Sequence, residues 1–329
     1  MLRLKTTTKV GAGMKKRIYT VLLAAALLLC GCTAVQMPTT TTQQTTTISL
    51  PATMVQSTTV LPTTVPATTL PPTTVSPTTL PPLTVPPTTV PPVTTVPTPS
   101  VLSFLKIALQ PVGNTMYVWG GGWNEEDTGA GEEATTLGVS PQWAVFAAQQ
   151  DSSYDMNNTR YQIHDGLDCS GYVGWAVYNL LETENGRPGY VMPSTQMALS
   201  LSQMGLGEYI PVGQLQDFRP GDIVSMEGHV WIVLGTCEDF SVLFVHASPP
   251  GVMISGTVNP DESESQASQL ARELMQQYYP EWYARYPDCA RSHRFLTESG
   301  AMRWHPEKLS DPEGVFQMTA HQIAELLFP

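Results

Sequence analysis

Residues 33–100 restrict the fold of this chain more than any other part of the sequence. The tract is dominated by Thr, Pro, Val and Leu, carries no charged residue, and repeats loosely as Pro-Thr-Thr-Val/Leu-Pro. Proline at this density excludes helices and sheets, and isolated Val and Leu residues cannot assemble a core. We therefore expect an extended stalk over residues 32–100, reaching at most about 200 Å at polyproline spacing. The folded domain is then confined to residues 101–329.

The charges of the chain are distributed very unevenly. All 28 acidic residues lie in residues 101–329 with 10 of the 16 basic residues, so this part has a formal charge of 10 − 28 = −18. A domain this acidic repels nucleic acid and anionic lipid. We therefore expect no nucleic-acid partner, whereas a basic or zwitterionic ligand remains compatible with the charge.

The first 31 residues have the parts of a secretory signal. They carry six basic residues and no acid, followed by a nine-residue apolar run at 21–29. That run is too short for a bilayer span, which needs about 20 residues. It ends in Leu29-Cys30-Gly31-Cys32, which resembles the bacterial lipobox. That resemblance implies a signal peptide at 1–31 and a lipidated Cys32 that anchors the protein on the outer face of the membrane. Residues 1–13 add nothing to such a signal, so both Met1 and Met14 are candidates for the natural start. The alternative is an ordinary secretion signal with incidental cysteines.

A cysteine at the start of an amphipathic segment is the candidate nucleophile. Asp168 precedes Cys169, and the apolar residues of 172–181 recur at helical spacing. Asp168 is a favourable N-cap, which places Cys169 in the first helical turn. The helix dipole at that position favours a thiolate, so we expect a reactive thiol.

Two of the six histidines lie on expected strands, residues 229–235 and 241–246. A hairpin with its tip at 236–239 places His229 directly opposite His246. One imidazole then serves as base toward Cys169 and the second orients it. The alternatives are two structural sheet histidines, or a zinc site with Cys169. Because no close Cys-x-x-Cys or His-x-x-x-His pair supports zinc, we expect no metal and no cofactor.

The remaining segments predict a mixed α+β domain. Helices are expected at 101–110, from 141, at 193–205, at 267–278 and from 319, where Thr319 and Gln322 form a capping box. Further strands are expected at 223–226, 251–258, 292–296 and 301–304. The remaining histidines are expected on the surface: His164, His293, His305 and His321.

Several short motifs occur in the order seen in the NlpC-type cysteine peptidases, which are papain-like bacterial cell-wall hydrolases. They are Tyr117-Val118-Trp119-Gly120-Gly121, Asp168-Cys169-Ser170-Gly171, Arg219-Pro220-Gly221-Asp222-Ile223, Gly228-His229-Val230 and Val245-His246-Ala247-Ser248. The match covers residues 101–258.

This resemblance implies a papain-like α+β fold, in which the nucleophile-bearing helix packs on a small antiparallel sheet with flanking helices. It implies Cys169 as nucleophile, His229 as base and acid, and His246 as the third polar residue. It also implies that Asp168, Ser170 and Tyr117 line the substrate site. The family cleaves murein stem peptides between D-glutamate, through its γ-carboxyl, and a diamino acid. We expect the same substrate and a monomer.

The sequence departs from the family in three places. Insertions are expected at 123–165 and 259–290, and Trp231 replaces the small residue usual two places after the histidine. The acids of the first insertion are expected to form a lid or an extra wall of the site. An amidase or acyltransferase with the same Cys–His pair, or an inactive wall-binding module, remains an alternative. Cys237 and Cys289 are candidates for a disulfide outside the cell.

Overall fold

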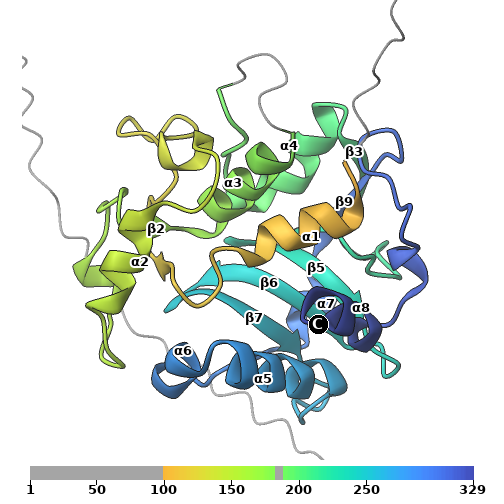
Figure 1. Cartoon of the computed structure of the whole chain (residues 1–329). Helices are drawn as coiled ribbons and strands as arrows, with labels where there is room; N and C mark the ends of the chain where they lie inside the picture. The colour runs from red at the N-terminus through yellow and green to blue at the C-terminus, as the bar shows by residue number, and fades with distance from the viewer. Residues whose placement is uncertain (1–98, 182–187) are drawn as a thin grey trace, which may run out of the picture. The chain divides into compact units, whose positions relative to one another are not determined.

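The computed structural model describes residues 99–181 and 188–329 (Figure 1). The signal peptide, the lipid anchor at Cys32 and residues 32–98 of the stalk lie outside the described residues and stay predictions. Pro99 and Ser100, predicted as the end of the stalk, contact the folded unit: Ser310 donates to the Pro99 carbonyl oxygen, and Ser100 is the N-cap of the first helix. All described residues belong to one compact unit, so the segments 123–165 and 259–290 are parts of it.

The centre of the described unit is a nine-stranded sheet. Its strands are β1 (Met116–Tyr117), β2 (Gly166–Leu167), β3 (Gly207–Ile210), β4 (Ile223–Met226), β5 (His229–Thr236), β6 (Val242–Ser248), β7 (Gly251–Thr257), β8 (Ala290–Arg291) and β9 (Gly300–Trp304). Their order is β2-β1-β7-β6-β5-β4-β9-β3, and β8 also pairs with β7. Only β1–β2 and β7–β8 are parallel pairs among the described strands. The α+β prediction is confirmed, although the sheet is larger than the small one expected.

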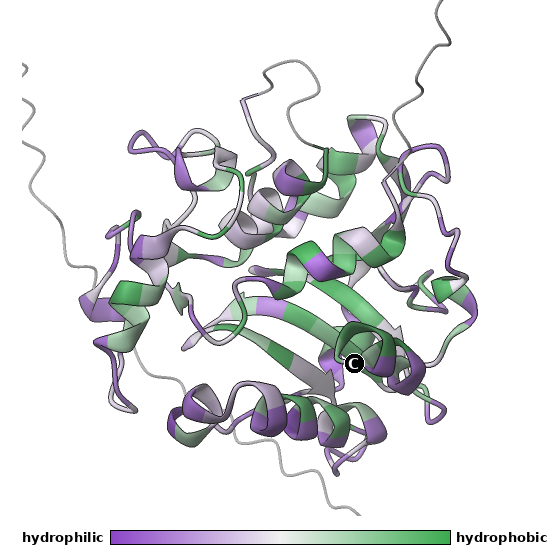
Figure 2. Ribbon diagram, viewed as in Figure 1, coloured by the Kyte–Doolittle hydropathy of each residue, from purple (hydrophilic) through white to green (hydrophobic). Residues whose placement is uncertain are grey.

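Eight α-helices surround the sheet in the described residues. They are α1 (Val101–Leu109), α2 (Pro141–Ala148), α3 (Cys169–Leu181), α4 (Met197–Gln203), α5 (Gln266–Tyr278), α6 (Pro280–Arg285), α7 (Arg294–Thr297) and α8 (Ala320–Leu327). Figure 1 shows α5 and α6 together on the β7 side of the sheet. The hydropathy colouring of Figure 2 shows α5 with apolar and polar residues in alternation, as expected of a helix that buries one face.

The helix starts predicted from N-cap residues at Ser140 and Thr319 are confirmed. The Ser140 side chain accepts from the N–H of Gln142 at α2, and Thr319 and Gln322 form the expected capping box of α8. The strand predicted at 292–296 is wrong, because this segment forms α7. There the Ser292 hydroxyl accepts the N–H of Arg294, and Arg294 pairs with Glu298 one turn later, so local contacts favour a turn over a strand.

The two faces of the sheet bury different cores. One core contains residues of α1, α3 and the inward side of β5 and β6. The other core is small and consists of Val224, Trp231, Val233, Val242, Phe244 and Ala301. Trp231 is fully buried in it, and its ring stacks on Phe218 with centroids 5.7 Å apart. Trp231 is therefore a core residue on the face of the sheet opposite α3.

The register of the β5–β6 hairpin differs from the prediction. Ile232 pairs with Val245, and the register shifts between Val233 and Gly235. His229 is therefore two residues away from direct opposition to His246. An even shift keeps both histidines on one face of the sheet, so their rings still meet along the diagonal.

The start of α3 lies directly on the loop that follows β1. A Cβ at Gly171 would lie 2.0 Å from the carbonyl oxygen of Gly121, and the N–H of Asp168 donates to that oxygen at 3.0 Å. Only glycine permits this approach of two backbones. The loop therefore fixes the position of the first turn of α3.

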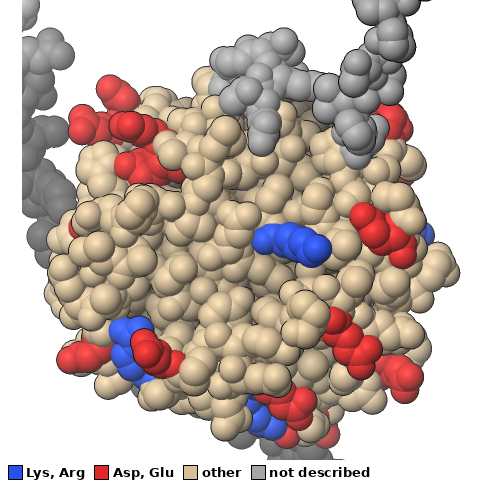
Figure 3. Space-filling model, viewed as in Figure 1, with Lys and Arg blue, Asp and Glu red and all other residues tan. Residues whose placement is uncertain are grey.

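Charged residues on the visible face of the molecule are mostly acidic (Figure 3). Its red side chains include a group near the segment between β1 and α2, which belongs to the acid-rich insertion. The described part of the chain thus presents an acidic surface, as its charge predicts.

Candidate functional site

Asp168 caps the helix that carries Cys169. Its Oδ1 accepts the N–H of Gly171 at 2.7 Å and the hydroxyl of Ser170 at 2.8 Å, and its Oδ2 accepts the N–H of Gly120 at 3.3 Å. Burial raises the pKa of Asp168 to about 6, although these donors oppose the rise. The predicted N-cap is confirmed, and Cys169 is the first residue of α3.

Cys169 lines a cavity of about 460 Å³. All three residues expected to line a substrate site, Tyr117, Asp168 and Ser170, border the same cavity. The remaining lining residues are Trp119, Gly120, Trp123, Asp127, Thr128, Pro193, Ser194, Thr195 and Gly228. The structure therefore brings these three predicted residues to the cysteine, whereas their roles stay predictions.

The thiol of Cys169 is only 5% exposed. Burial, followed by the negative charge of Asp168, raises the pKa of the Cys169 thiol to about 12. The N–H of Val230, the hydroxyl of Ser194 and the N–H of Ser170 oppose the rise. The prediction of a thiolate is therefore wrong for this structure, because loss of water outweighs the donors at the helix start.

The half-buried His229 pairs with the fully buried His246. The Nε2 of His229 lies 2.8 Å from the Nδ1 of His246, and the Nε2 of His246 lies 3.0 Å from the Oγ of Ser255. Burial and then the charge of Arg291 lower the pKa of His229 to about 3, and the same causes lower that of His246 further below its usual range. Both rings are therefore neutral at pH 7. Ser255 was missed in the sequence, where only its polarity on a buried strand marks it.

The cysteine and the histidine pair lie on neighbouring elements without a direct hydrogen bond. The sulfur contacts the N–H of Val230, the residue after His229, whereas no hydrogen bond joins the sulfur to the His229 ring in the described residues. Gly228, on the other side of His229, borders the cavity, but His229 itself does not. The His229 ring packs against His246 and Phe295, with centroids 5.1 and 5.7 Å apart.

Residues from the segment 123–165 form one wall of the Cys169 cavity. Trp123 donates from Nε1 to the Oγ of Ser170 at 3.0 Å, and Asp127 and Thr128 border the cavity. A second cavity of about 550 Å³ shares Gly120, Trp123 and Asp127 with the first. The expectation of an extra wall agrees with this placement; Ser194 and Thr195, on the 3₁₀ turn Ser194–Gln196, were missed.

The other cysteines and histidines lie elsewhere. Cys237 and Cys289 are buried free thiols, so the structure contains no disulfide between them. His164 and His321 are exposed as expected, whereas His293 and His305 are half-buried. His164 contacts the Glu133 carboxylate, which raises the pKa of the His164 imidazole.

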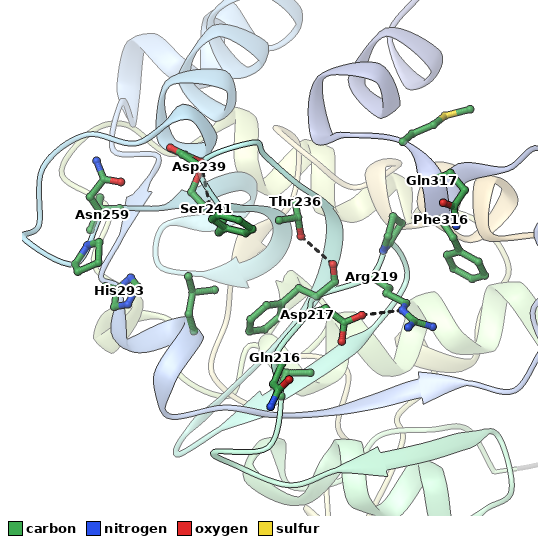
Figure 4. Close-up of a pocket in the computed structure, with 18 residues that line it drawn as sticks. Gln216, Asp217, Arg219, Thr236, Asp239, Ser241, Asn259, His293, Phe316 and Gln317 are labelled. Carbon is green, nitrogen blue, oxygen red and sulfur yellow. Dashed lines mark hydrogen bonds and ion pairs between the residues drawn. The ribbon is translucent and has the colours of Figure 1, made fainter.

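A further cavity, of about 900 Å³, lies at the turn end of β5 and β6, and Cys169 does not border it. Figure 4 shows Asp217 against Arg219 on one side of it and Asp239 against Ser241 on another. Arg303 also pairs with Asp217, and Asp239 accepts the N–H of Gln266 at 2.8 Å. Asp217 and Asp239 are thus already bonded to neighbouring groups. Ser241 and His293 also border this cavity, and the Ser241 hydroxyl donates to Asp239.

Within the described ranges, no group of three or more His, Cys, Asp and Glu side chains is placed to hold a metal ion. Nor does any helix of 99–181 or 188–329 have the length and apolarity needed to cross a bilayer. No family model, curated protein or solved structure matches the chain.

Proposed function

We propose that this protein is a papain-like thiol endopeptidase that cleaves an amide bond in murein stem peptides, of the γ-D-glutamyl–diamino acid type. The observation that carries the proposal is the position of Cys169, at the start of a capped helix and against the N–H that follows His229. The Nε2 of His229 is paired with His246, and we assign the other ring nitrogen, Nδ1, as the atom that accepts the thiol proton.

The reaction begins with transfer of the Cys169 thiol proton to the Nδ1 of His229 as sulfur attacks the substrate carbonyl. The N–H of Cys169, which as first residue of the helix has no intrahelical acceptor, stabilises the oxyanion. The C–N bond breaks, the leaving amine takes the proton from His229, and a thioester remains. Water then attacks the thioester, His229 takes its proton and returns it to the sulfur, and the acid is released.

His246 and Ser255 support this proton transfer by fixing the tautomer of His229. When the Nε2 of His229 donates to His246, the Nδ1 is unprotonated and can accept the thiol proton. The Nε2 of His246 then donates to the Oγ of Ser255. Both residues are positioning residues, because neither touches the reacting atoms.

One observation favours a second candidate, an inactive wall-binding module. The neutral thiol and neutral imidazole lack a direct hydrogen bond, and burial opposes formation of an ion pair. In this alternative the cavity binds stem peptides without cleaving them.

Digestion of purified murein separates the two. We expect the folded domain to release fragments whose masses correspond to cleavage after the glutamyl residue, and Cys169→Ala to release none. Cys289→Ala, which removes a buried cysteine outside the cavity, should retain activity. Binding to murein without release by the wild-type protein supports the binding module, and fragments cut at another amide indicate an amidase.

We further propose that lipidation of Cys32 anchors the protein at the outer face of the bacterial membrane, with the stalk extending the hydrolase toward the wall. Mass spectrometry of the mature N-terminus tests this, and an unmodified or absent Cys32 contradicts it.

A further inference from the structure

Arg160 differs from the other arginines of the described chain in what its guanidinium contacts. Most of them form ion pairs: Arg219, Arg272, Arg291, Arg294 and Arg303. Arg285 also lies over aromatic rings, those of Trp282 and Tyr286, but its guanidinium donates to the carbonyl oxygens of Ala147 and Gln150. The Arg160 guanidinium instead lies 4.8 Å from the ring centroid of Trp119 and 5.9 Å from that of Tyr161, with no ion pair among the described residues. Its donors are therefore available to a ligand.

Arg160 lies against Trp119, one of the residues that line the Cys169 cavity. Trp119 borders that cavity and is 41% exposed, so its ring is accessible to a bound molecule. Burial raises the pKa of the Tyr117 hydroxyl, and the nearby charge of Arg160 opposes the rise. Tyr117 also borders the cavity. The charge of Arg160 thus acts on the wall of the cavity that contains the nucleophile.

The segment carrying Arg160 is held in place by several bonds. The N–H of Tyr161 donates to the carbonyl oxygen of Trp119 at 2.9 Å. The hydroxyl of Tyr154 donates to the backbone carbonyl oxygen of Tyr117 at 2.6 Å. Tyr154 also bonds to Thr159 at 2.8 Å. Tyr161 adopts a left-handed backbone with φ of 64°, which costs about 1 kcal/mol or more in a residue with a side chain. The loop therefore presents Arg160 in a defined position.

The charged residues bordering the Cys169 cavity are otherwise acidic. Asp127 and Asp168 line it, and no lysine or arginine does. A carboxylate entering this cavity would be repelled by both aspartates unless a cation lies nearby. A guanidinium stacked on an aromatic ring is well suited to bind a carboxylate through two parallel hydrogen bonds.

We propose that Arg160 is a specificity-determining residue that binds a free carboxylate of the substrate at the Trp119 side of the cavity. This inference rests on the proposed function, because it concerns recognition of the same substrate. A stem peptide offers this chemistry from two sources: the α-carboxylate of its D-glutamyl residue, and the side-chain carboxylate of a diamino acid such as diaminopimelate.

Three synthetic peptides distinguish the sources. The first is L-Ala-γ-D-Glu-diaminopimelate, the second replaces the glutamyl α-carboxylate by an amide, and the third replaces diaminopimelate by lysine. Cleavage of each is measured with the wild-type protein, Arg160→Gln and Arg160→Lys. Arg294→Gln serves as control, because Arg294 is 69% exposed on α7 and does not border the cavity. The same peptides are titrated calorimetrically into Cys169→Ala with and without Arg160→Gln.

We expect Arg160→Gln to raise KM about tenfold for the first peptide and to leave kcat nearly unchanged. With the peptide that lacks the recognised carboxylate, the KM of the wild-type protein should already be about tenfold higher than with the first peptide. Arg160→Gln should not raise the KM for that peptide any further. Arg160→Lys should recover part of the affinity. Equal effects of Arg160→Gln on all three peptides, or none, overturn the inference.

Failure of the proposed function gives a different result. Absence of cleavage of all three peptides by the wild-type protein rejects the endopeptidase, while calorimetry still reports whether Arg160 discriminates the carboxylate. Absence of binding of any peptide to Cys169→Ala rejects the inference as well.

Discussion

The Nε2 of His229 and the Nδ1 of His246 are 2.8 Å apart, although the two residues are not directly opposed on their strands. The contact continues from His246 to Ser255 on β7. Three neighbouring strands thus supply one chain of polar groups that ends at the Nδ1 of His229.

The first prediction concerns Ser255. In Ser255→Ala the Nε2 of His246 loses its partner, so we expect kcat to fall about tenfold with KM unchanged. Ser225→Ala is the matched control: it also removes a buried serine hydroxyl, which accepts the N–H of Ala198, but it contacts neither histidine. Equal kcat values for the two variants would exclude a positioning role for Ser255.

The second prediction concerns the acid side of the stability profile. Folding keeps His229 and His246 neutral by lowering their pKa values, so the unfolded chain binds more protons below about pH 6.5. The contribution of the two neutral histidines to the free energy of unfolding is fully present above that pH. It is lost as pH falls, by up to about 1.4 kcal/mol per pH unit for each ring. Asp168, with its raised pKa, acts in the opposite sense between about pH 4 and 6.

Urea unfolding at pH 5 and pH 7 measures this dependence. We expect His246→Gln to lose less stability between these two values than the wild-type protein, whereas the exposed His321→Gln should follow the wild type. A His246→Gln profile with an unchanged slope would contradict the prediction.

The third prediction concerns the charge beside the thiol. Asp168→Asn keeps an N-cap side chain while removing the negative charge that raises the pKa of Cys169. We therefore expect alkylation of Cys169 by iodoacetamide at pH 8 to become about fivefold faster. Asp127 borders the same cavity but does not raise the pKa of the Cys169 thiol, so Asp127→Asn should change the alkylation rate little. Peptide mapping identifies the labelled cysteine.

The fourth prediction concerns Gly171. Its replacement by alanine drives a Cβ to 2.0 Å from the carbonyl oxygen of Gly121, so helix and loop must separate. We expect Gly171→Ala to lower the free energy of unfolding by about 3 kcal/mol or more. Gly129→Ala, in the same part of the chain, meets no atom within 4 Å and should stay within about 1 kcal/mol of the wild type. Thermal unfolding of both variants tests the difference.

Local sequence signals predicted much of the secondary structure. The caps at Asp168, Ser140 and Thr319 were recognisable because short-range hydrogen bonds decide them. The hairpin register was not, because it depends on an irregularity near Val233 and on Phe240, which turns the chain at φ of 66°. A phenylalanine carries no signal for that conformation, which glycine or asparagine usually marks.

The residues of the site were easier to predict than its electrostatics. Cys169 and Asp168 could be predicted because the sequence marks the start of a helix there. The charge state of the thiol could not, because it depends on how completely neighbouring segments bury the sulfur. Ser194 and Ser255 come from elements that only the tertiary fold brings near. Arg160 belongs to the segment 123–165, and no helix or strand pattern in that segment predicted that it lies near Cys169.

The contact of Gly171 with Gly121 has a mechanical consequence. The oxygen that accepts the Asp168 N–H belongs to the same short loop from which the acid-rich insertion departs at Gly122. Any displacement of the loop that contains Gly121 would therefore also displace the sulfur of Cys169. We therefore expect any widening of the Cys169 cavity to occur where it is lined by residues 193–195 and Gly228.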